Sequence, residues 1–394
     1  MYREACLSSG PGANNGSDPP LAPVARRRLE VAIVLFSGRL GGAETFSAHL
    51  AAHLPDHGVD GHVVLIEGVG ELPQRLDSLG VPYTVYGARR GRDIVYTPRR
   101  FARLINECGH DGAILGWPGY LAATLRLGGY RGTLVAVEHG AQLSEDRSRL
   151  PRRLYKRLDW CAGVWATDQH VAVSRFALAR LQRGAHRGRP TVIYNGVDLT
   201  QFRPRRTSSM GDEGAVVIGA ASRLVEGKGI DVLLRAMASL RESVDTRLVI
   251  AGDGPERASL RQLATRLGLD REAAFIGWTN DLPGFWAQCD VAAMPSDTWI
   301  ETFGLSAVEP MACSVPVVAT LNGGLSEVVA DGATGLLVPP GDATALAAAL
   351  ERYARDRELR RAHGVAARLR AERHFDIKES ARAYADLVSS LGHA

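Results

Sequence analysis

Two glutamates and a glycine in one short stretch have the right chemistry to bind hydroxyl and phosphate groups. The stretch runs from Glu301 to Glu309 as E-T-F-G-L-S-A-V-E, after an apolar, strand-like run and a turn. A helix that opens at Gly304 would leave free N–H groups on its first turn, where an anion or a hydroxyl oxygen can bind. Glu309 would lie about two helical turns beyond Glu301, on the face of the helix entrance. Such a site suits a ligand with hydroxyls at both ends and phosphate between them, such as a nucleotide sugar.

A second stretch supplies positive charge. Arg223 and Lys228 lie in the sequence R-L-V-E-G-K-G, directly after another strand-like run. Arginine can form two parallel hydrogen bonds to phosphate oxygens, and lysine adds a mobile charge. A helix that begins near Gly229 would point its positive end at the same place. The glycine spacing is not that of a Walker A loop, so the stretch is either a phosphate site of another kind or two solvated surface cations.

The sequence G-D-G-P at 252–255 resembles the start of a dinucleotide-binding fingerprint. Arg257 occupies the place of the third glycine, where a bulky side chain prevents close packing of helix on strand. We therefore expect a tight turn at Gly252 and Gly254 that lines the pocket of a nucleotide base, and no nicotinamide site.

Three further features leave two interpretations open. His139, after a strand-like run, could donate to a phosphate or a sugar hydroxyl, or be a structural hydrogen-bonding residue. The segment 147–158 carries six cations, with a leucine at every fourth position, which predicts a basic amphipathic helix. It could contact anionic lipid or a phosphorylated acceptor, or pack its leucines inward and solvate its arginines. The arginine-rich segment 89–103 is open in the same way.

Several functions are disfavoured by what the sequence lacks. It contains no His, Cys or Asp cluster with metal-ligand spacing and no G-x-S-x-G elbow, which argues against metal hydrolases and serine hydrolases. Its basic segments lack the interleaved aromatic residues typical of single-strand nucleic-acid binding. We expect no metal, no cofactor and no nucleic-acid partner.

The elements that must position these residues alternate along the chain. A length of 394 residues predicts two domains. Apolar runs typical of buried parallel strands alternate with helical patterns, which predicts an α/β fold with two doubly wound parallel sheets. The predicted strands are 31–36, 63–66, 83–86, 113–115, 134–137, 171–173 and 191–194, then 215–221, 247–251, 274–276, 291–294, 315–319 and 335–338.

Composition predicts how the chain is divided. We expect a disordered tail at 1–28, an N-terminal domain at 29–200, a C-terminal domain at 201–375, and a final helix at 376–394 that packs back towards the N-terminal domain. Residues 1–200 hold 25 Lys and Arg against 18 Asp and Glu, and the rest hold 22 against 25, so an anionic partner would favour the first half. The sequence shows no signal peptide pattern and no apolar run near the ~18 residues of a membrane span, and its five cysteines lack paired spacing. We therefore expect a cytoplasmic protein. If the basic helix contacts lipid, the protein would lie at the inner face of the membrane.

Together these stretches resemble the retaining glycosyltransferases of family 4, which have the GT-B fold of two Rossmann-like domains facing across a cleft. The resemblance covers about residues 31–375, and the combination of E-x7-E with R-x4-K is its most specific part. The other matching pieces are Gly41-Gly42-Ala43-Glu44, Glu138-His139, Val171-Ala172-Val173-Ser174, Asn195-Gly196-Val197-Asp198, Gly252-Asp253-Gly254 and Gly323-Gly324 with Glu327.

The resemblance implies a role for each matching position. Glu309 would hold the ribose hydroxyls of the nucleotide, while Arg223 and Lys228 would neutralise the diphosphate leaving group. Glu301 would orient the sugar hydroxyls, and His139 would contact the donor sugar from the N-terminal domain. The implied donor-binding set is completed by Gly41 and Gly42, which let the first loop close over phosphate, and by Gly254, Phe303, Gly304, Leu305 and Ser306.

The resemblance also implies the reaction. A sugar would pass from a nucleotide-sugar donor, a UDP-sugar before GDP-mannose, to an acceptor hydroxyl with retained configuration and no obligatory metal. The acceptor stays open between a natural-product scaffold, a lipid-linked sugar and a polyol, as does the oligomeric state. The alternatives are a sugar-nucleotide epimerase or hydrolase on the same fold, and a non-catalytic binding protein with a damaged donor site. The segment 297–300 is longer and more aromatic than in the commoner family form, and its Trp299 either shapes the substrate pocket or only packs the loop.

Overall fold

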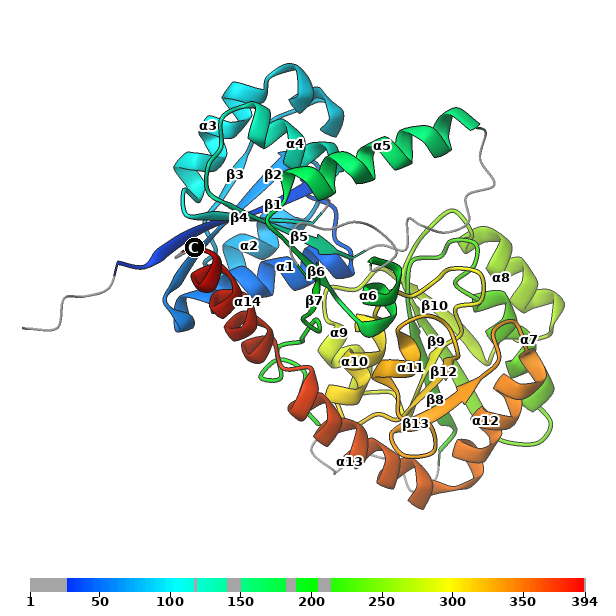
Figure 1. Ribbon diagram of the computed structural model, residues 1–394. Helices are drawn as coiled ribbons and strands as arrows, with labels where there is room; N and C mark the ends of the chain where they lie inside the picture. The colour runs from blue at the N-terminus through cyan, green and yellow to red at the C-terminus, as the bar shows by residue number, and fades with distance from the viewer. Residues whose placement is uncertain (1–26, 117–118, 140–149, 182–188, 205–213, 393–394) are drawn as a thin grey trace, which may run out of the picture.

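The structure is a computed structural model that describes residues 27–116, 119–139, 150–181, 189–204 and 214–392 (Figure 1). The tail predicted at 1–28 lies almost wholly outside these residues, as does the start of the basic segment at 147–149. The structure describes no side chain from 150 to 157, so the two interpretations of that segment stay predictions.

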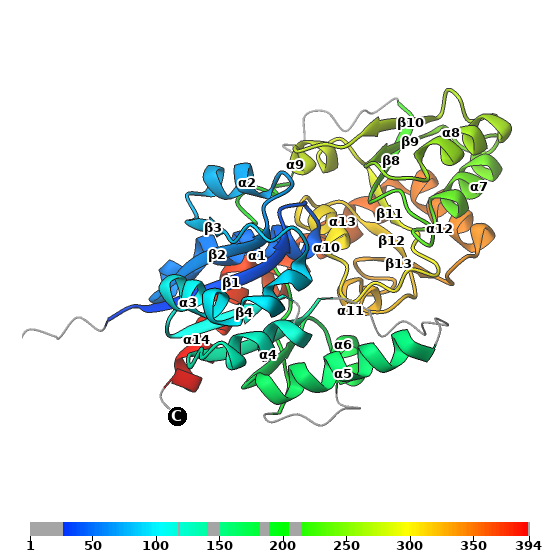
Figure 2. The same ribbon diagram turned by 90° about the horizontal axis from the view of Figure 1, so that it is seen from above.

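Two parallel sheets form two domains, which lie side by side in both views (Figures 1 and 2). The first sheet has 7 strands in the order β3-β2-β1-β4-β5-β6-β7, and the second has 6 in the order β10-β9-β8-β11-β12-β13. The strand order reverses between β1 and β4 in one sheet and between β8 and β11 in the other, which is where doubly wound sheets bind ligands. The predicted fold class is confirmed.

Every predicted strand is present, with ends that differ by a few residues. The second sheet begins its β12 two residues later than predicted, because Pro316 has no N–H to donate to a neighbouring strand. The strands of the first sheet are β1 (Leu29–Ser37), β2 (Val59–Glu67), β3 (Tyr83–Val85), β4 (Gly112–Leu115), β5 (Thr133–Glu138), β6 (Gln169–Ala172) and β7 (Thr191–Val192). Those of the second are β8 (Val216–Ala221), β9 (Thr246–Ala251), β10 (Ala273–Gly277), β11 (Val291–Met294), β12 (Val317–Thr320) and β13 (Gly335–Val338).

Helices cover both faces of each sheet, which is why central strands such as Val291–Met294 are apolar at every position and buried. The N-terminal domain has α1 (Gly42–His53), α2 (Leu72–Leu79), α3 (Pro98–Cys108), α4 (Gly119–Leu127), α5 (Leu150–Ala166) and α6 (Arg175–Leu181), with 3-10 turns η1 (Leu54–His57) and η2 (Gly91–Tyr96). The rest of the chain has α7 (Ile230–Leu240), α8 (Arg257–Arg266), α9 (Leu282–Trp286), α10 (Leu305–Ala312), α11 (Leu325–Val328), α12 (Ala343–Arg355), α13 (Arg357–His374) and α14 (Ile377–Gly392).

The last helix returns to the first domain. After α13 the chain crosses from the second domain, and α14 packs on α1 (Figure 1). The ring centroids of Tyr384 and Phe46 lie 6.2 Å apart, and both side chains are buried. The core of the first domain therefore includes the C-terminal end of the described chain. Among the described helices, none is long and apolar enough to cross a membrane.

Candidate active site

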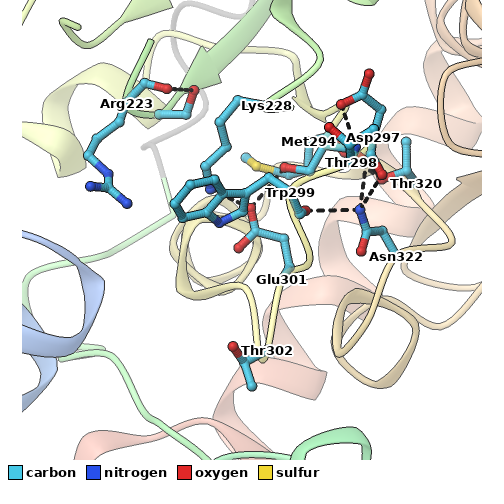
Figure 3. Close-up of polar contacts among 12 residues, drawn as sticks. Arg223, Lys228, Met294, Asp297, Thr298, Trp299, Glu301, Thr302, Thr320 and Asn322 are labelled. Atoms are coloured by element: carbon cyan, nitrogen blue, oxygen red, sulfur yellow. Dashed lines mark hydrogen bonds and ion pairs between the residues drawn. The ribbon is translucent and has the colours of Figure 1, made fainter. Parts of the chain in front are cut away.

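The two predicted ligand-binding stretches meet where the second sheet changes direction (Figure 3). The loop after β8 carries Arg223 and Lys228, and the loop after β11 carries Glu301. Lys228 Nζ lies 2.5 Å from Glu301 Oε1, and Ser296 Oγ donates to the same oxygen at 2.8 Å. Glu301 is therefore an oriented carboxylate that already has a cation beside it.

A small pocket lies against this ion pair, between the carboxyl ends of β8 and β11 and the first turn of α10. Its polar lining consists of Lys228, Glu301 and the hydroxyl-bearing residues Ser222, Ser296 and Ser306. An ammonium, a carboxylate and three hydroxyls provide donors for phosphate oxygens and acceptors for sugar hydroxyls. The structure brings Lys228 and Glu301 together at this point, although they are 73 positions apart in the sequence.

The loop after β11 is held by backbone contacts. Asn322 Nδ2 donates to the carbonyl groups of Ser296, Asp297 and Trp299 at 3.1, 3.0 and 3.0 Å. The carbonyl of Gly227 accepts from the amides of Asp297 at 2.9 Å and Trp299 at 3.1 Å. These bonds tie the loop after β11 to the loops that follow β12 and β8.

Helix α10 begins after Gly304, as predicted. Gly304 has a φ of 98°, and a Cβ there would lie 2.5 Å from Leu325 Cδ2, so the position requires glycine. Leu305 and Ser306 are the first two helical residues, and their N–H groups have no acceptor within the helix. The positive end of α10 therefore borders the pocket that Ser306 lines.

Glu309 lies in the second turn of α10 and has different surroundings from Glu301. Trp286 Nε1 donates to its Oε2 at 3.3 Å. Burial raises the pKa of Glu309 to about 7, although the bond from Trp286 lowers it. None of the ion pairs among the described residues involves Glu309, so its carboxylate can accept hydrogen bonds from ligand hydroxyls.

Arg223 is exposed and is the cation nearer to the N-terminal domain. Its Cζ lies 5.1 Å from the centroid of the Trp299 ring. Its charge also acts on Glu44 of α1, where burial raises the pKa of the carboxyl group and Arg223 partly offsets that increase. This electrostatic interaction joins the loop after β8 in one domain to the first helix of the other.

The first turn of α1 lies opposite the first turn of α10. Gly42 opens α1, and a Cβ there would lie 3.6 Å from Leu305 Cδ1. Gly41 is the residue before the helix, and a Cβ there would meet Glu44 Oε2 at 2.6 Å. Two helix N-termini thus lie at the same domain boundary, and the closing of the first loop over phosphate stays a prediction.

His139 follows β5 and contacts the second domain. Burial lowers its pKa to about 4, so the ring is neutral at pH 7 and can donate one hydrogen bond without repelling Arg223 or Lys228. Its ring centroid lies 5.9 Å from that of Phe46, and its carbonyl accepts from Thr302 Oγ1 at 3.0 Å. The backbone carbonyl of His139 therefore holds this residue beside the loop that carries Glu301.

Two residues of the second domain form hydrogen bonds across the boundary. Thr302 donates to His139 and, through its own carbonyl, accepts from Ser174 Oγ at 2.6 Å. The carboxylate of Glu327 accepts from the amides of Arg175 and Phe176, at 2.9 and 2.6 Å, at the start of α6. A negative charge at that helix N-terminus is stabilising, so the contact fixes one domain against the other.

Two predicted donor-binding residues have structural explanations. Gly254 has a φ of 157°, and a Cβ there would lie 2.3 Å from the carbonyl oxygen of Leu224, so glycine lets the turn after β9 pack on the loop after β8. The Phe303 ring is 3% exposed and packs against Tyr194 and Phe375 at centroid distances of 5.9 and 5.6 Å. Phe303 can reach a donor only through its backbone, and the base pocket at Gly254 stays a prediction.

Sequence reasoning assigned no role to Asn322, Thr302 or Trp286. Each acts on a residue distant in the chain, so no local pattern marks it. Glu327 and Ser174 belong to pieces that the family resemblance matched, and that match was the only sequence signal for their positions.

Comparisons with known proteins bear on the family of the chain. The family model described as Glycosyl transferases group 1 matches residues 205–370, and Glycosyltransferase Family 4 matches residues 40–201. The chain is 34% identical over 317 residues to a GDP-mannose-dependent alpha-(1-6)-phosphatidylinositol monomannoside mannosyltransferase of Mycolicibacterium smegmatis, across 75% of this chain and 80% of that protein. It is 38% identical over 272 residues to a D-inositol 3-phosphate glycosyltransferase of Saccharomonospora viridis, across 65% of this chain and 62% of that protein.

Solved structures agree with the fold. The structure of Anabaena Alr3699/HepE in complex with UDP and glucose has a TM-score of 0.80 and 25% identity, and the match covers 92% of this chain and 100% of that chain. Sucrose-phosphate synthase from Thermosynechococcus elongatus shares the fold, with a TM-score of 0.74 and 22% identity over 92% of this chain and 99% of that chain. The chain therefore belongs to glycosyltransferase family 4 and is a glycosyltransferase with the two-domain GT-B fold.

Proposed function

We propose that the protein is a retaining glycosyltransferase that transfers a hexose from a nucleotide-sugar donor to an acceptor hydroxyl without a metal or other cofactor. The Lys228–Glu301 ion pair beside the pocket is the observation that carries this proposal. Negative charge grows on the diphosphate oxygen as its bond to the sugar breaks. Cations and helix amides that are already in place stabilise the transition state most at that moment.

The charged site residues, the first amides of α10 and His139 then each have a defined part. Arg223, Lys228 and the first amides of α10 take the diphosphate, and Glu309 accepts from the ribose hydroxyls. Glu301 orients the sugar, because a carboxylate held by an ammonium group at 2.5 Å is a poor nucleophile. The neutral ring of His139 donates to the sugar from the other domain.

The donors we propose are a UDP-sugar and GDP-mannose. A solved structure with 25% identity is described in complex with UDP-glucose, whereas the mycobacterial relative with 34% identity is described as GDP-mannose-dependent. Because the diphosphate and the ribose are common to both donors, the residues assigned above serve either one.

For the acceptor we propose a polyol or sugar hydroxyl on an anionic molecule, with a lipid-linked sugar included. Relatives are described as acting on phosphatidylinositol monomannoside and on D-inositol 3-phosphate. Residues 1–200 carry the excess of basic over acidic residues, 25 against 18. On α5, Leu158 and Trp165 are 60% and 57% exposed, which suits a peripheral contact with the cytoplasmic face of a membrane.

Calorimetric titration with UDP, GDP, ADP and NAD tests the proposal, with Glu309→Ala as the control variant. We expect one nucleoside diphosphate to bind and the variant to lose that binding. Binding of NAD alone, or of none of the four, would overturn the proposal. Incubation of the donor without acceptor separates a transferase from the hydrolase or epimerase alternative, since only the latter two turn over the donor at full rate.

A further inference from the structure

Trp299 lies against both cations of the candidate active site, and the matched motifs do not include it. Arg223 Cζ and Lys228 Nζ are each 5.1 Å from the centroid of its ring. Figure 3 draws the three side chains. Indole attracts cations more strongly than the other aromatic side chains do. The Trp299 side chain is 39% exposed, so core burial does not explain its position.

The backbone of Trp299 is hydrogen-bonded to the loop that carries Lys228. Trp299 N donates to the carbonyl of Gly227 at 3.1 Å, and Asn322 Nδ2 donates to the carbonyl of Trp299 at 3.0 Å. A Cβ on Gly227, whose φ is 85°, would lie 2.8 Å from Trp299 N, so this close approach depends on glycine. The backbone that carries the indole is therefore held at a fixed place beside the loop that carries the ammonium group.

We propose that Trp299 is a positioning residue that holds Arg223 and Lys228 in place for the diphosphate leaving group. Without a ligand the two cations repel each other, and among the described residues Glu301 forms an ion pair with Lys228 and none with Arg223. The π-electrons of the indole attract both cations and hold them beside one side chain. When a diphosphate binds, the side chains of Arg223 and Lys228 then need to move little to contact it. The inference rests on the proposed function, since it requires a diphosphate at this site.

The test compares affinity for a nucleoside diphosphate with affinity for the free nucleoside, using UDP and uridine or GDP and guanosine. For Trp299→Leu we expect the diphosphate affinity to fall about tenfold and the nucleoside affinity to stay unchanged. Trp299→Phe keeps an aromatic face and should recover part of the loss. A residue that only packs the loop would change both affinities together.

Trp165→Leu is the matched control for nucleotide affinity, because Trp165 is an exposed indole on α5 in the other domain and its proposed membrane contact involves no nucleotide. It should leave both affinities unchanged, and thermal unfolding reports whether each variant is folded. If the wild type binds no nucleoside diphosphate, the proposed function fails. If the wild type binds and folded Trp299→Leu binds equally well, or loses nucleoside and diphosphate affinity alike, only the positioning role is overturned.

Discussion

Glu301 and Glu309 belong to one loop and helix, yet their surroundings differ in charge. Glu301 has the Lys228 ammonium at 2.5 Å and a serine hydroxyl at 2.8 Å. Glu309 has a single indole donor at 3.3 Å, and burial raises its pKa to about 7. The first carboxylate is already balanced and suited to orienting a sugar. The second lacks a counter-charge, so it gains most from ligand hydroxyls. This difference supports the proposal that Glu301 binds the sugar end of the donor and Glu309 the ribose end.

Of the substitutions that test this difference between the two glutamates, removal of Lys228 should change activity most. Lys228→Ala takes a cation from the leaving group and leaves Glu301, whose side chain is 15% exposed, without its partner. We expect the kcat/KM of donor cleavage to fall by about 10²–10³, as for loss of one preorganised donor at a developing charge. Steady-state assays of sugar release to water, with the donor that calorimetry identifies, measure this. Lys228→Arg should retain part of the activity because it keeps the charge. A fully active Lys228→Ala would remove Lys228 from the mechanism.

Glu309→Gln should weaken nucleotide binding instead. A carboxylate accepts hydrogen bonds from both ribose hydroxyls more strongly than an amide does, so we expect an affinity loss of about 10- to 100-fold. Calorimetry should show the same factor for the free nucleoside and its diphosphate, because both contain the ribose. A loss confined to the diphosphate would instead place Glu309 near the phosphates.

The raised pKa of Glu309 also predicts a pH dependence of stability. Between its ordinary value of 4.5 and about 7, the folded protein binds a proton at this group that the unfolded chain has released. The free energy of unfolding therefore decreases as pH rises through that window. Glu309→Gln removes this contribution, so its stability relative to wild type should increase from pH 5 to pH 7.5 by on the order of 1–3 kcal/mol. Urea denaturation across this range measures the difference, and parallel curves would show that the group titrates normally.

The fold was readable from sequence because its signals are local. An apolar run such as 291–294 is typical of a strand in a parallel sheet that is covered on both faces, and Gly304 marks a helix entrance that no other residue fits. The cations and glutamates of the site were readable because their spacing is fixed within single loops. Their positions relative to one another, including the Lys228–Glu301 ion pair, could not be predicted, because these depend on how the strands of the second sheet are arranged.

The contacts that hold the site were not readable. Asn322 contacts carbonyl groups 23 to 26 positions away, and the partners of Thr302 lie 128 and 163 positions away. Threonine and asparagine are common in loops, so neither residue type nor spacing distinguishes these two from solvated neighbours. Burial of His139, which makes it a neutral donor rather than a cation, likewise depends on packing that a strand-end histidine does not reveal.

The smallest predicted effect concerns the hydrogen bond from Thr302 to His139 between the domains. Thr302→Val keeps the shape of the side chain and the carbonyl that accepts from Ser174, and it removes only the hydroxyl that donates to His139. One neutral hydrogen bond is worth about 1 kcal/mol, so we expect the kcat of donor cleavage to fall about fivefold. Nucleoside affinity should not change, because the donor domain is intact. Thr302→Ser should restore the rate.

A double-mutant cycle makes this prediction specific. Ser174→Ala removes the other hydrogen bond of Thr302 while leaving the hydroxyl that donates to His139. If the two hydrogen bonds jointly set the distance between His139 and Glu301, the double variant should lose less activity than the product of the two single losses. The reason is that loss of one bond already displaces Thr302, so the other bond can no longer hold it in position. Independent losses would mean that each bond acts alone. A fall in nucleoside affinity for Thr302→Val, like that expected for Glu309→Gln, would place the role of Thr302 within the donor domain and not at the boundary.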